Sequence, residues 1–236
     1  MDEPRVSAVI PVYNDRVALT RAIPESLRWL GDRAEVIVAE DGSTDGSREL
    51  VEEWEGRDPR VRLLHADERL GRGAALERAF RAARAPVVCY FDVDLATDMA
   101  CLAPLIAAVR EEGYDIATGS RLLPESDTGR SALREVASRG YNLLVRLILH
   151  SRLRDHQCGF KAFRRDRILE LLPEVQATHW FWDTEVLVRA ARRSWRIAEI
   201  PVRWREGEGT TVRGSDALSM GRAIIRLWWQ IHVEED

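Results

Sequence analysis

The sequence lacks several features that mark well-known classes of protein. It has no run of about 18 apolar residues, so we expect no transmembrane helix in it. It opens with MDEPR, which is acidic where a secretory signal peptide is basic, so we expect no signal peptide. Its formal net charge is −4, which argues against a protein that binds nucleic acid through its overall charge. We therefore expect a cytoplasmic protein without a nucleic-acid partner.

Cysteine is scarce as well. Cys89, Cys101 and Cys158 are the only three, and their spacing matches no metal-binding motif. An odd number of thiols is typical of a protein from a reducing compartment. Hydrophobic residues, by contrast, make up 45% of the 236 residues, which is enough for the core of one large domain.

Apolar runs and helical patterns alternate along the first part of the chain. The patterns predict strands at 6–12, 35–39, 61–64 and 86–91, and helices at 16–30, from the turn 40–46 through Trp54, and at 71–84. This alternation predicts an α/β fold of the Rossmann-like kind, with a mostly parallel sheet and helices on both faces. Ligands of such sheets bind where the strands end, and three polar loops, 13–15, 40–45 and 92–98, fall there.

The last of these loops follows a buried strand in the stretch PVVCYFDVDLATD and contains Asp92 and Asp94. Residues i and i+2 of an extended chain point the same way, so both carboxylates leave the strand together. Two like charges side by side repel, and oxygen ligands suit Mg²⁺ or Mn²⁺ bound to a substrate phosphate. The pair by itself also fits a solvated loop, but the neighbouring polar loops favour a metal site.

Gly71 and Gly73 flank Arg72 at the start of a helix. The glycines could let the backbone approach a phosphate, with Arg72 adding charge. They could equally be a helix start that needs flexible residues, and the isolated pattern favours this second interpretation. The third glycine of the dinucleotide-binding motif is missing.

Two amphipathic helices are expected near the end of the chain, at 131–150 and 215–236. In the first, Val136, Leu144 and Leu147 share an apolar face, while Arg139 and Asn142 lie on the polar face. The second carries Trp228 and Trp229 side by side, which is typical of anchoring at a membrane interface. Packing against the sheet and resting on an anionic membrane surface both agree with this pattern.

Eight segments, in this order and spacing, resemble the family 2 glycosyltransferases with a GT-A fold. They are VSAVIPVYND, EDGSTDGS, RLGRGAALERAF, YFDVDLATD, TGSR, HQCGFKAF, FWDTEVLVRA and EIPVRWREGEG, and they cover roughly residues 5–215. The likeness is strongest to the dolichyl-phosphate glucosyltransferase and dolichyl-phosphate mannose synthase branch. It implies a GT-A catalytic domain at 1–214, with a membrane-interfacial helix at 131–150, followed by a C-terminal amphipathic helix at 215–236.

The resemblance also implies roles for individual residues on the donor side. The residues that would bind the nucleotide sugar are Pro11, Tyr13, Asp15, Asp41, Arg72, Asp92, Asp94 and Arg203. Asp92 and Asp94 would hold Mg²⁺ or Mn²⁺ at the diphosphate, which Arg203 would grip. Three positions depart from the family pattern: the first loop ends in Asp15 where glutamate is commoner, Glu40 stands for aspartate, and Arg72 stands for lysine, which changes geometry at equal charge.

On the acceptor side, the resemblance implies that Arg121, Arg134 and Ser138 receive a phosphate. Asp183 and Glu185 match an acidic pair below the sugar, although carboxylates at a helix start also suit the helix dipole. Asp94, Arg121 and Asp183 are the residues expected to take part in catalysis.

The leading hypothesis is an inverting transfer of a hexose from a nucleotide sugar to a polyprenyl or dolichyl phosphate, at the cytoplasmic face of a membrane. UDP-glucose is preferred as the donor over GDP-mannose. The metal, Arg72 and Arg203 would offset the charge on the departing diphosphate. A phosphate acceptor, with a second pKa near 6, hardly needs a base, whereas a sugar hydroxyl would need Asp183 as one.

Three other functions agree less well with these residues. The runner-up enzyme transfers sugar to a glycan or other hydroxyl acceptor. A nucleotidyltransferase would carry a Gly-rich loop after the first strand, where Tyr13 stands instead. A non-catalytic domain that binds a nucleotide sugar is disfavoured, because every acidic and basic position that the mechanism needs is filled.

Overall fold

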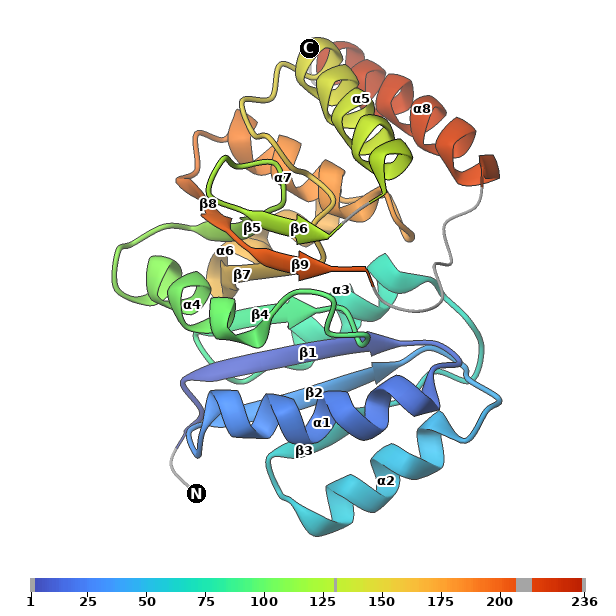
Figure 1. The fold of residues 1–236 in the computed structure, drawn as a ribbon, viewed down its shortest axis with the longest axis vertical. Coiled ribbons are helices and arrows are strands. Elements are labelled where there is room, and N and C mark those ends of the chain that lie inside the picture. The colour runs from blue at the N-terminus through green and yellow to red at the C-terminus, as the bar shows by residue number, and fades with distance from the viewer. Residues whose placement is uncertain (1–2, 130, 207–213, 235–236) are drawn as a thin grey trace.

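The computed structural model describes residues 3–129, 131–206 and 214–234. Seven strands form one central sheet in the order β3-β2-β1-β4-β7-β5-β8 (Figure 1). Their bounds are β1 Val6–Val12, β2 Ala34–Glu40, β3 Val61–Leu64, β4 Val87–Phe91, β5 Ile116–Ser120, β7 Phe160–Arg164 and β8 Ile197–Pro201. Neighbouring strands are parallel except at β7, which runs antiparallel to both β4 and β5. The predicted, mostly parallel sheet is confirmed.

The first strands are apolar throughout because both of their faces are covered. Every residue of β1 and β2 is buried, as expected for parallel strands between two helical layers. Val6, Ala8 and Ile10 of β1 point into one core, whereas Val9 points into the other. This alternation is the ordinary period of a strand, so the core on each face takes every second residue.

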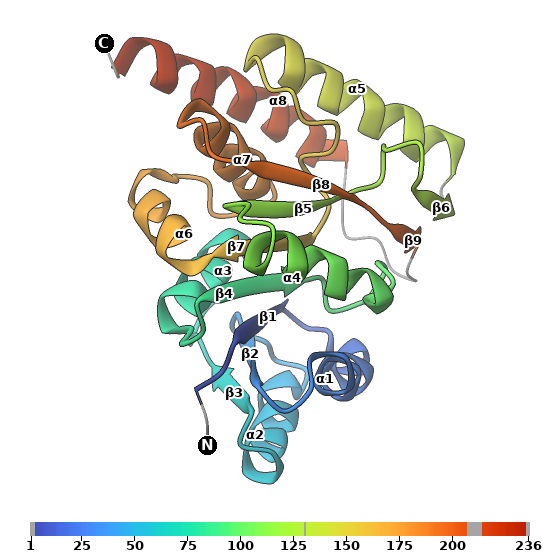
Figure 2. The same ribbon diagram turned by 90° about the vertical axis from the view of Figure 1, so that its left-hand side faces the viewer.

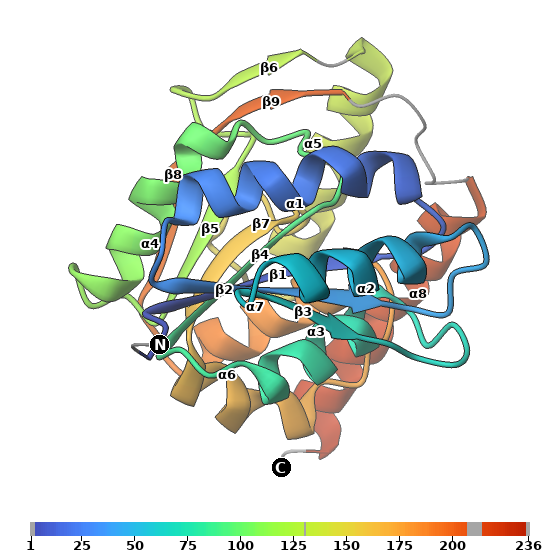
Figure 3. The same cartoon turned by 90° about the horizontal axis from the view of Figure 1, so that it is seen from below.

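Helices form a layer on each face of the sheet (Figure 2). Helices α1 (Arg16–Leu30), α2 (Ser47–Arg57) and α4 (Leu102–Arg110) share one core. Helices α3 (Arg72–Ala82), α6 (Arg165–Leu171) and α7 (Trp182–Arg192) share the other. Figure 3 shows the two layers from below, with α1 on one side of β1 and β2 and with α3 and α6 on the other.

Two long helices lie side by side on the outer side of α7 (Figures 1 and 2). They are α5 (Ala132–Ile148) and α8 (Gly214–Trp229), which continues as a π-helical turn over Gln230–Glu234. Val145 of α5, Ile224 and Leu227 of α8 and Val188 of α7 form a third, smaller core. Within the described ranges, no helix has the length and apolar character needed to cross a membrane.

The polar face predicted for α5 needs one correction. Asn142, which was expected beside Arg139 on that face, is buried, whereas the apolar side chains of Val136, Leu144 and Leu147 are exposed. Helical periodicity separates the two faces of a helix, but it does not say which face meets the protein.

A small second sheet closes the fold beside the 92–98 loop. Strand β9 (Arg203–Arg205) pairs with β6 (Asp127–Gly129), and Trp204 bridges to Thr97. Strand β8 ends at Pro201 and β9 begins at Arg203, so the segment 199–205 is divided between the two sheets. This division carries Arg203 to the edge of the sheet where β4 ends.

Candidate functional site

The polar loops that follow β1 and β2 are joined by hydrogen bonds between their backbones and side chains. The backbone N–H of Asn14 donates to Ser43 Oγ (2.9 Å), and that of Thr44 donates to Asn14 Oδ1 (2.8 Å). Asp45 Oδ2 accepts from the backbone N–H of Arg16 (2.9 Å). The two predicted loops therefore form one surface at the carboxyl edge of the sheet.

Four of the residues expected to bind the nucleotide sugar, those on β1, β2 and their loops, differ in how far a ligand could reach them. Tyr13 is exposed, and the guanidinium of Arg69 lies 4.1 Å from the centre of its ring. Asp15 caps α1 by accepting from the backbone of Ala18 (3.2 Å), and Pro11 is buried within β1. Asp41 is buried, and its two oxygens accept from the backbone of the 70–71 turn, each at 2.9 Å.

Tyr13 and Arg69 thus offer an exposed flat surface next to the buried Asp41. Sequence reasoning missed Arg69, because nothing in its local pattern reveals that it covers an aromatic ring 56 positions earlier in the chain. Stacked aromatic and guanidinium groups can hold the flat base of a nucleotide.

Asp92 and Asp94 stand at the end of β4 in different electrostatic surroundings. Arg72 pairs with Asp92 (Nη2–Oδ1 2.8 Å), whereas Arg21 reaches only the backbone carbonyl of Asp94 (2.5 Å). Burial raises the pKa of Asp94, and the nearby carboxylates of Asp92 and Asp15 raise it further, against a hydrogen bond from the backbone of Ala96. Asp94 thus carries a charge that a cation would stabilise.

This pair fits a divalent cation that takes its other ligands from a substrate. Within residues 3–129, 131–206 and 214–234, no group of three or more His, Cys, Asp or Glu side chains is placed to hold a metal by itself. Two carboxylates with the remaining oxygens from phosphate and water is the arrangement that Mg²⁺ commonly adopts.

A buried group of charges lies directly behind Asp92. Arg72 donates to Asp92 and, through Nη1, to Asp183 Oδ2 (2.8 Å), so its guanidinium bridges the two carboxylates. Lys161, fully buried, lies 3.1 Å from Asp183 Oδ1, and the hydroxyl of Tyr90 donates to the same oxygen. Burial alone would raise the pKa of Asp183, but Lys161, Arg72 and the Tyr90 hydrogen bond outweigh it, and the pKa is lowered.

The same group explains the arginine at position 72. A guanidinium donates from several nitrogens in one plane, so Arg72 can bind Asp92 and Asp183 at once. Lys161 supplies a second cation to Asp183. Glu185, the second member of the acidic pair, binds Arg189 (2.9 Å) and is buried within α7.

Gly71 and Gly73 serve packing in this structure. A Cβ on Gly73 would lie 2.7 Å from the Trp182 side chain, and one on Gly71 would meet the carbonyl oxygen of Thr178. Gly71 also has φ +106, which side chains disfavour. The N–H of Gly73 donates to Thr178 O (2.7 Å). Both glycines are therefore required by the packing at the start of α3.

The residues expected at the acceptor phosphate lie on the other side of β7. Arg121, at the end of β5, pairs with the buried Asp155 through Nε (2.6 Å) and Nη2 (2.9 Å). Arg134 of α5 forms an ion pair with Glu206, and Ser138 lies one turn further along the same helix. On the donor side, Arg203 pairs with Asp98 (2.8 Å) in the loop that follows Asp94.

Comparisons with known proteins decide the family. Residues 7–172 match the family described as Glycosyl transferase family 2. The chain belongs to glycosyltransferase family 2.

Several curated proteins are similar to this family 2 glycosyltransferase. It is 49% identical over 234 residues to glycosyltransferase AglD of Haloferax volcanii, covering 97% of this chain and 38% of AglD. It is 31% identical over 242 residues to the dolichyl-phosphate beta-glucosyltransferase ALG5D of Trichomonas vaginalis, covering 96% of this chain and 74% of that protein. The human dolichyl-phosphate beta-glucosyltransferase is 30% identical over 240 residues, which cover 94% of this chain and 74% of the human protein.

Solved structures share the fold. Glucosyl-3-phosphoglycerate synthase from Mycobacterium tuberculosis, in complex with Mn²⁺, UDP and glucosyl-3-phosphoglycerate, aligns with a TM-score of 0.69 at 21% identity over 96% of this chain and 79% of that chain. The mannosyltransferase PcManGT from Pyrobaculum calidifontis, in complex with GDP-Man and Mn²⁺, aligns with a TM-score of 0.64 at 20% identity over 98% and 65%. The predicted GT-A fold is thereby confirmed.

Gly159 of the family 2 enzyme leaves the space that Asp92 occupies. A Cβ at position 159 would overlap Asp92 Oδ2. We expect Gly159→Ala to push Asp92 away from Arg72 and to lower the transfer rate about 100-fold, because small misplacements of reacting groups have effects of this size. Gly56→Ala in α2, where a Cβ meets nothing within 4 Å, is the control and should keep full activity in the same assay.

His156 connects α5 to the loop that carries Asp155. Its ring accepts from the Ser151 hydroxyl at Nε2 (2.7 Å) and donates from Nδ1 to Asn142 Oδ1 (2.8 Å). Burial lowers the pKa of His156 to about 4, although the charge of Asp155 opposes this. The neutral ring is therefore the form that the fold requires.

This histidine predicts how stability changes with pH. As the pH decreases below 6.5, His156 becomes protonated in the unfolded chain, whereas in the folded chain it stays neutral until about pH 4. The free energy of unfolding should therefore decrease as the pH is lowered from 6.5 to 4, by on the order of 3 kcal/mol. Urea unfolding of the wild type and of His156→Asn at several pH values checks this: the variant should show a shallower dependence on pH.

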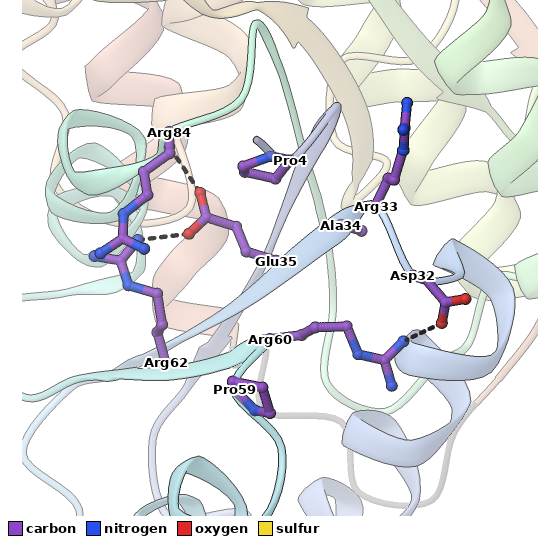
Figure 4. A pocket seen from close by; sticks show the side chains of 9 residues that line it. All are labelled: Pro4, Asp32, Arg33, Ala34, Glu35, Pro59, Arg60, Arg62 and Arg84. Atoms are coloured by element: carbon purple, nitrogen blue, oxygen red, sulfur yellow. Dashed lines mark hydrogen bonds and ion pairs between the residues drawn. The ribbon is translucent and has the colours of Figure 1, made fainter. Parts of the chain in front are cut away.

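The opposite edge of the sheet carries a cavity of about 280 Å³ lined by Arg33, Arg60, Arg62 and Arg84 (Figure 4). Arg62 is already paired with Glu35 (2.6 Å), and Arg60 with Asp58 (2.7 Å). The cavity lies where β2 and β3 begin, whereas ligands of such sheets bind where the strands end, so the functional site is assigned to the carboxyl edge.

Proposed function

We propose that this enzyme transfers a hexose from a nucleotide sugar, with UDP-glucose favoured over GDP-mannose, to a polyprenyl or dolichyl phosphate. The single observation that carries the proposal is the placement of two charge systems on one edge of the sheet. Asp92, Asp94 and Arg72 suit a metal-bound diphosphate, and Arg121 suits a phosphate acceptor. The names of the relatives, dolichyl-phosphate beta-glucosyltransferases, support the acceptor and the donor sugar.

On the donor side, Asp92 and Asp94 would hold Mg²⁺ or Mn²⁺, which would stabilise the diphosphate as it leaves. Tyr13 and Arg69 would stack on the base, and Asp15 and Asp41 would shape the loops around the nucleoside. Arg203 would exchange its partner Asp98 for the diphosphate.

On the acceptor side, Arg121 would bind the phosphate, with Arg134 and Ser138 of α5 beside it. Asp155 holds the Arg121 guanidinium in one orientation through two hydrogen bonds. A phosphate oxygen would attack the anomeric carbon as the bond from that carbon to the leaving diphosphate breaks. This single displacement inverts the configuration at the anomeric carbon.

We further propose that α5 and α8 rest on the cytoplasmic face of a membrane, where the lipid acceptor resides. Both helices bury one apolar stripe in the third core and expose another. The exposed stripes include Leu147 (63% exposed) and Trp229 (49% exposed), together with Val136, Leu143, Leu144, Ile225, Trp228 and Val233. An exposed apolar patch of this kind is typical of a surface that contacts a membrane or a partner. In this proposal, residues 1–214 are the catalytic domain and 215–236 complete its membrane face.

A transfer assay tests the proposed reaction. The purified enzyme is given Mn²⁺ or Mg²⁺, a short polyprenyl phosphate, and radiolabelled UDP-glucose or GDP-mannose in parallel. We expect label to enter the lipid from UDP-glucose and to require the metal. Label entering a glycan acceptor instead would support the runner-up enzyme, and no transfer to the lipid from either donor would contradict the proposal.

Vesicle sedimentation tests the membrane face separately. Vesicles of phosphatidylcholine and phosphatidylglycerol should bind the enzyme, and the double variant Leu144→Ser/Trp229→Ser should weaken binding about tenfold, because apolar burial drives it. Val17→Ser on α1, which changes an even more exposed apolar residue, should bind as the wild type does. Equal binding of all three proteins would contradict this role for α5 and α8.

A further inference from the structure

Lys161 is fully buried and lies behind the surface that a substrate would contact. Its Nζ has three partners: Asp183 Oδ1 at 3.1 Å, the carbonyl of Cys158 at 2.6 Å and the carbonyl of His156 at 3.3 Å. An ammonium group has three N–H donors, so these contacts occupy all of them. Lys161 can therefore influence the site only through its ion pair with Asp183.

Asp183 is in turn occupied on both of its oxygens. The Tyr90 hydroxyl of β4 and Lys161 of β7 act on Oδ1, and Arg72 of α3 acts on Oδ2. Tyr141 of α5 faces this carboxylate through Thr184, whose hydroxyl it contacts at 2.7 Å. The carboxylate is thus fixed in one orientation by groups from three elements.

The charges in this group are matched as they stand. Arg72 and Lys161 supply two positive charges, and Asp92 and Asp183 supply two negative ones. A proton on Asp183 would leave two cations facing one carboxylate in a buried place, which is strongly unfavourable. A carboxylate that acts as a general base needs surroundings that raise its pKa towards the working pH, whereas two adjacent cations lower it.

We propose that Lys161 is a positioning residue that fixes Asp183, that Asp183 thereby aims Arg72 at the donor diphosphate, and that Asp183 accepts no proton during transfer. The inference rests on the proposed function and deepens it: the acceptor must arrive already ionised, as a phosphate monoester does at pH 7. If Asp92 bound a cation, Arg72 would keep its second partner, Asp183.

The first test measures the ionisation of Asp183 without any substrate. The side-chain carboxyl signal of Asp183 is followed by ¹³C NMR from pH 8 to pH 5 and assigned by its loss in Asp183→Asn. We expect no titration over this range in the wild type. A midpoint between pH 6 and pH 8 would overturn the inference, because Asp183 would then be suited to act as a base.

The second test measures positioning by calorimetry with Mn²⁺·UDP and Mn²⁺·GDP. Lys161→Met and Asp183→Asn should each weaken binding of the better nucleotide about tenfold. The double variant should be no weaker than either single variant, because both act through Arg72. Losses that multiply to about 100-fold would overturn the positioning role.

Lys161→Arg keeps the charge and should restore most of the affinity that Lys161→Met loses. If Lys161→Met does not fold, the inference is tested by the titration of Asp183 in the wild type and by the nucleotide affinity of Asp183→Asn. Neither test uses an acceptor, so failure to transfer sugar to a polyprenyl phosphate would contradict the proposed function and leave the result for Asp183 unaffected.

Discussion

Replacing Asp94 by alanine should lower the transfer rate at least about 1,000-fold. Asp94 is the carboxylate at the end of β4 whose pKa burial raises and whose side chain lacks the arginine that Asp92 has. Loss of the cation would remove several kcal/mol of stabilisation from the departing diphosphate, and each 1.4 kcal/mol is a factor of ten in rate. The measurement is kcat/KM in the radiolabelled transfer assay, with Mn²⁺ varied.

The matched control is Asp32→Ala. Asp32 carries the same charge on a fully exposed side chain at the opposite edge of the sheet, so its loss should leave kcat/KM unchanged. Calorimetry with UDP should show that Mn²⁺ strengthens binding to the wild type and no longer does so for Asp94→Ala. An Asp94→Ala enzyme with more than a tenth of the wild-type rate would exclude Asp94 from the metal site.

Replacing Arg121 by methionine should lower the free energy of unfolding by about 3–5 kcal/mol, the usual effect of breaking a buried ion pair on one side. The Asp155 carboxylate is fully buried and accepts from Arg121 through Nε, Nη2 and the backbone N–H. Without the guanidinium it would remain as an unpaired buried charge. Urea unfolding of the two proteins at pH 7 measures the difference.

A second variant separates stability from function at this pair. Arg121→Met/Asp155→Leu removes both charges, so most of the lost stability should return. Transfer should stay lost, because the acceptor phosphate still lacks its arginine. Recovery of transfer together with stability would show that Arg121 has only a structural role. Arg139→Met, which removes an exposed ion pair with Glu135, is the control and should cost less than about 1 kcal/mol.

The Arg121–Asp155 pair also has a pH signature. Burial by itself would raise the pKa of Asp155, but Arg121 outweighs it and holds the pKa well below the usual range. The stability from this ionised carboxylate is therefore present above about pH 4, where an unfolded aspartate ionises, and is lost as the pH falls towards the folded value. The double variant should lack this component of acid unfolding.

The outline of the fold and the edge on which the site lies could be predicted from the residue pattern alone. Apolar runs such as 6–12 can be buried only between two helical layers, and the loops after such strands must meet at one edge. Asp92 and Asp94 were recognisable because their chemistry is local: two carboxylates one residue apart at a strand end. Amphipathic spacing likewise located α5 and α8.

Which charges pair with one another depends on how the chain folds. Arg72, Lys161 and Asp183 lie far apart in the chain, and they come together because β7 runs antiparallel between β4 and β5, while α3 and α7 pack on the same face. The direction of a strand leaves no mark on its residue pattern, so neither the pairing of Asp183 with Lys161 nor that of Arg121 with Asp155 could be derived beforehand. Periodicity also could not tell that Asn142 faces the protein, because the two faces of a helix are distinguished only by what packs against them.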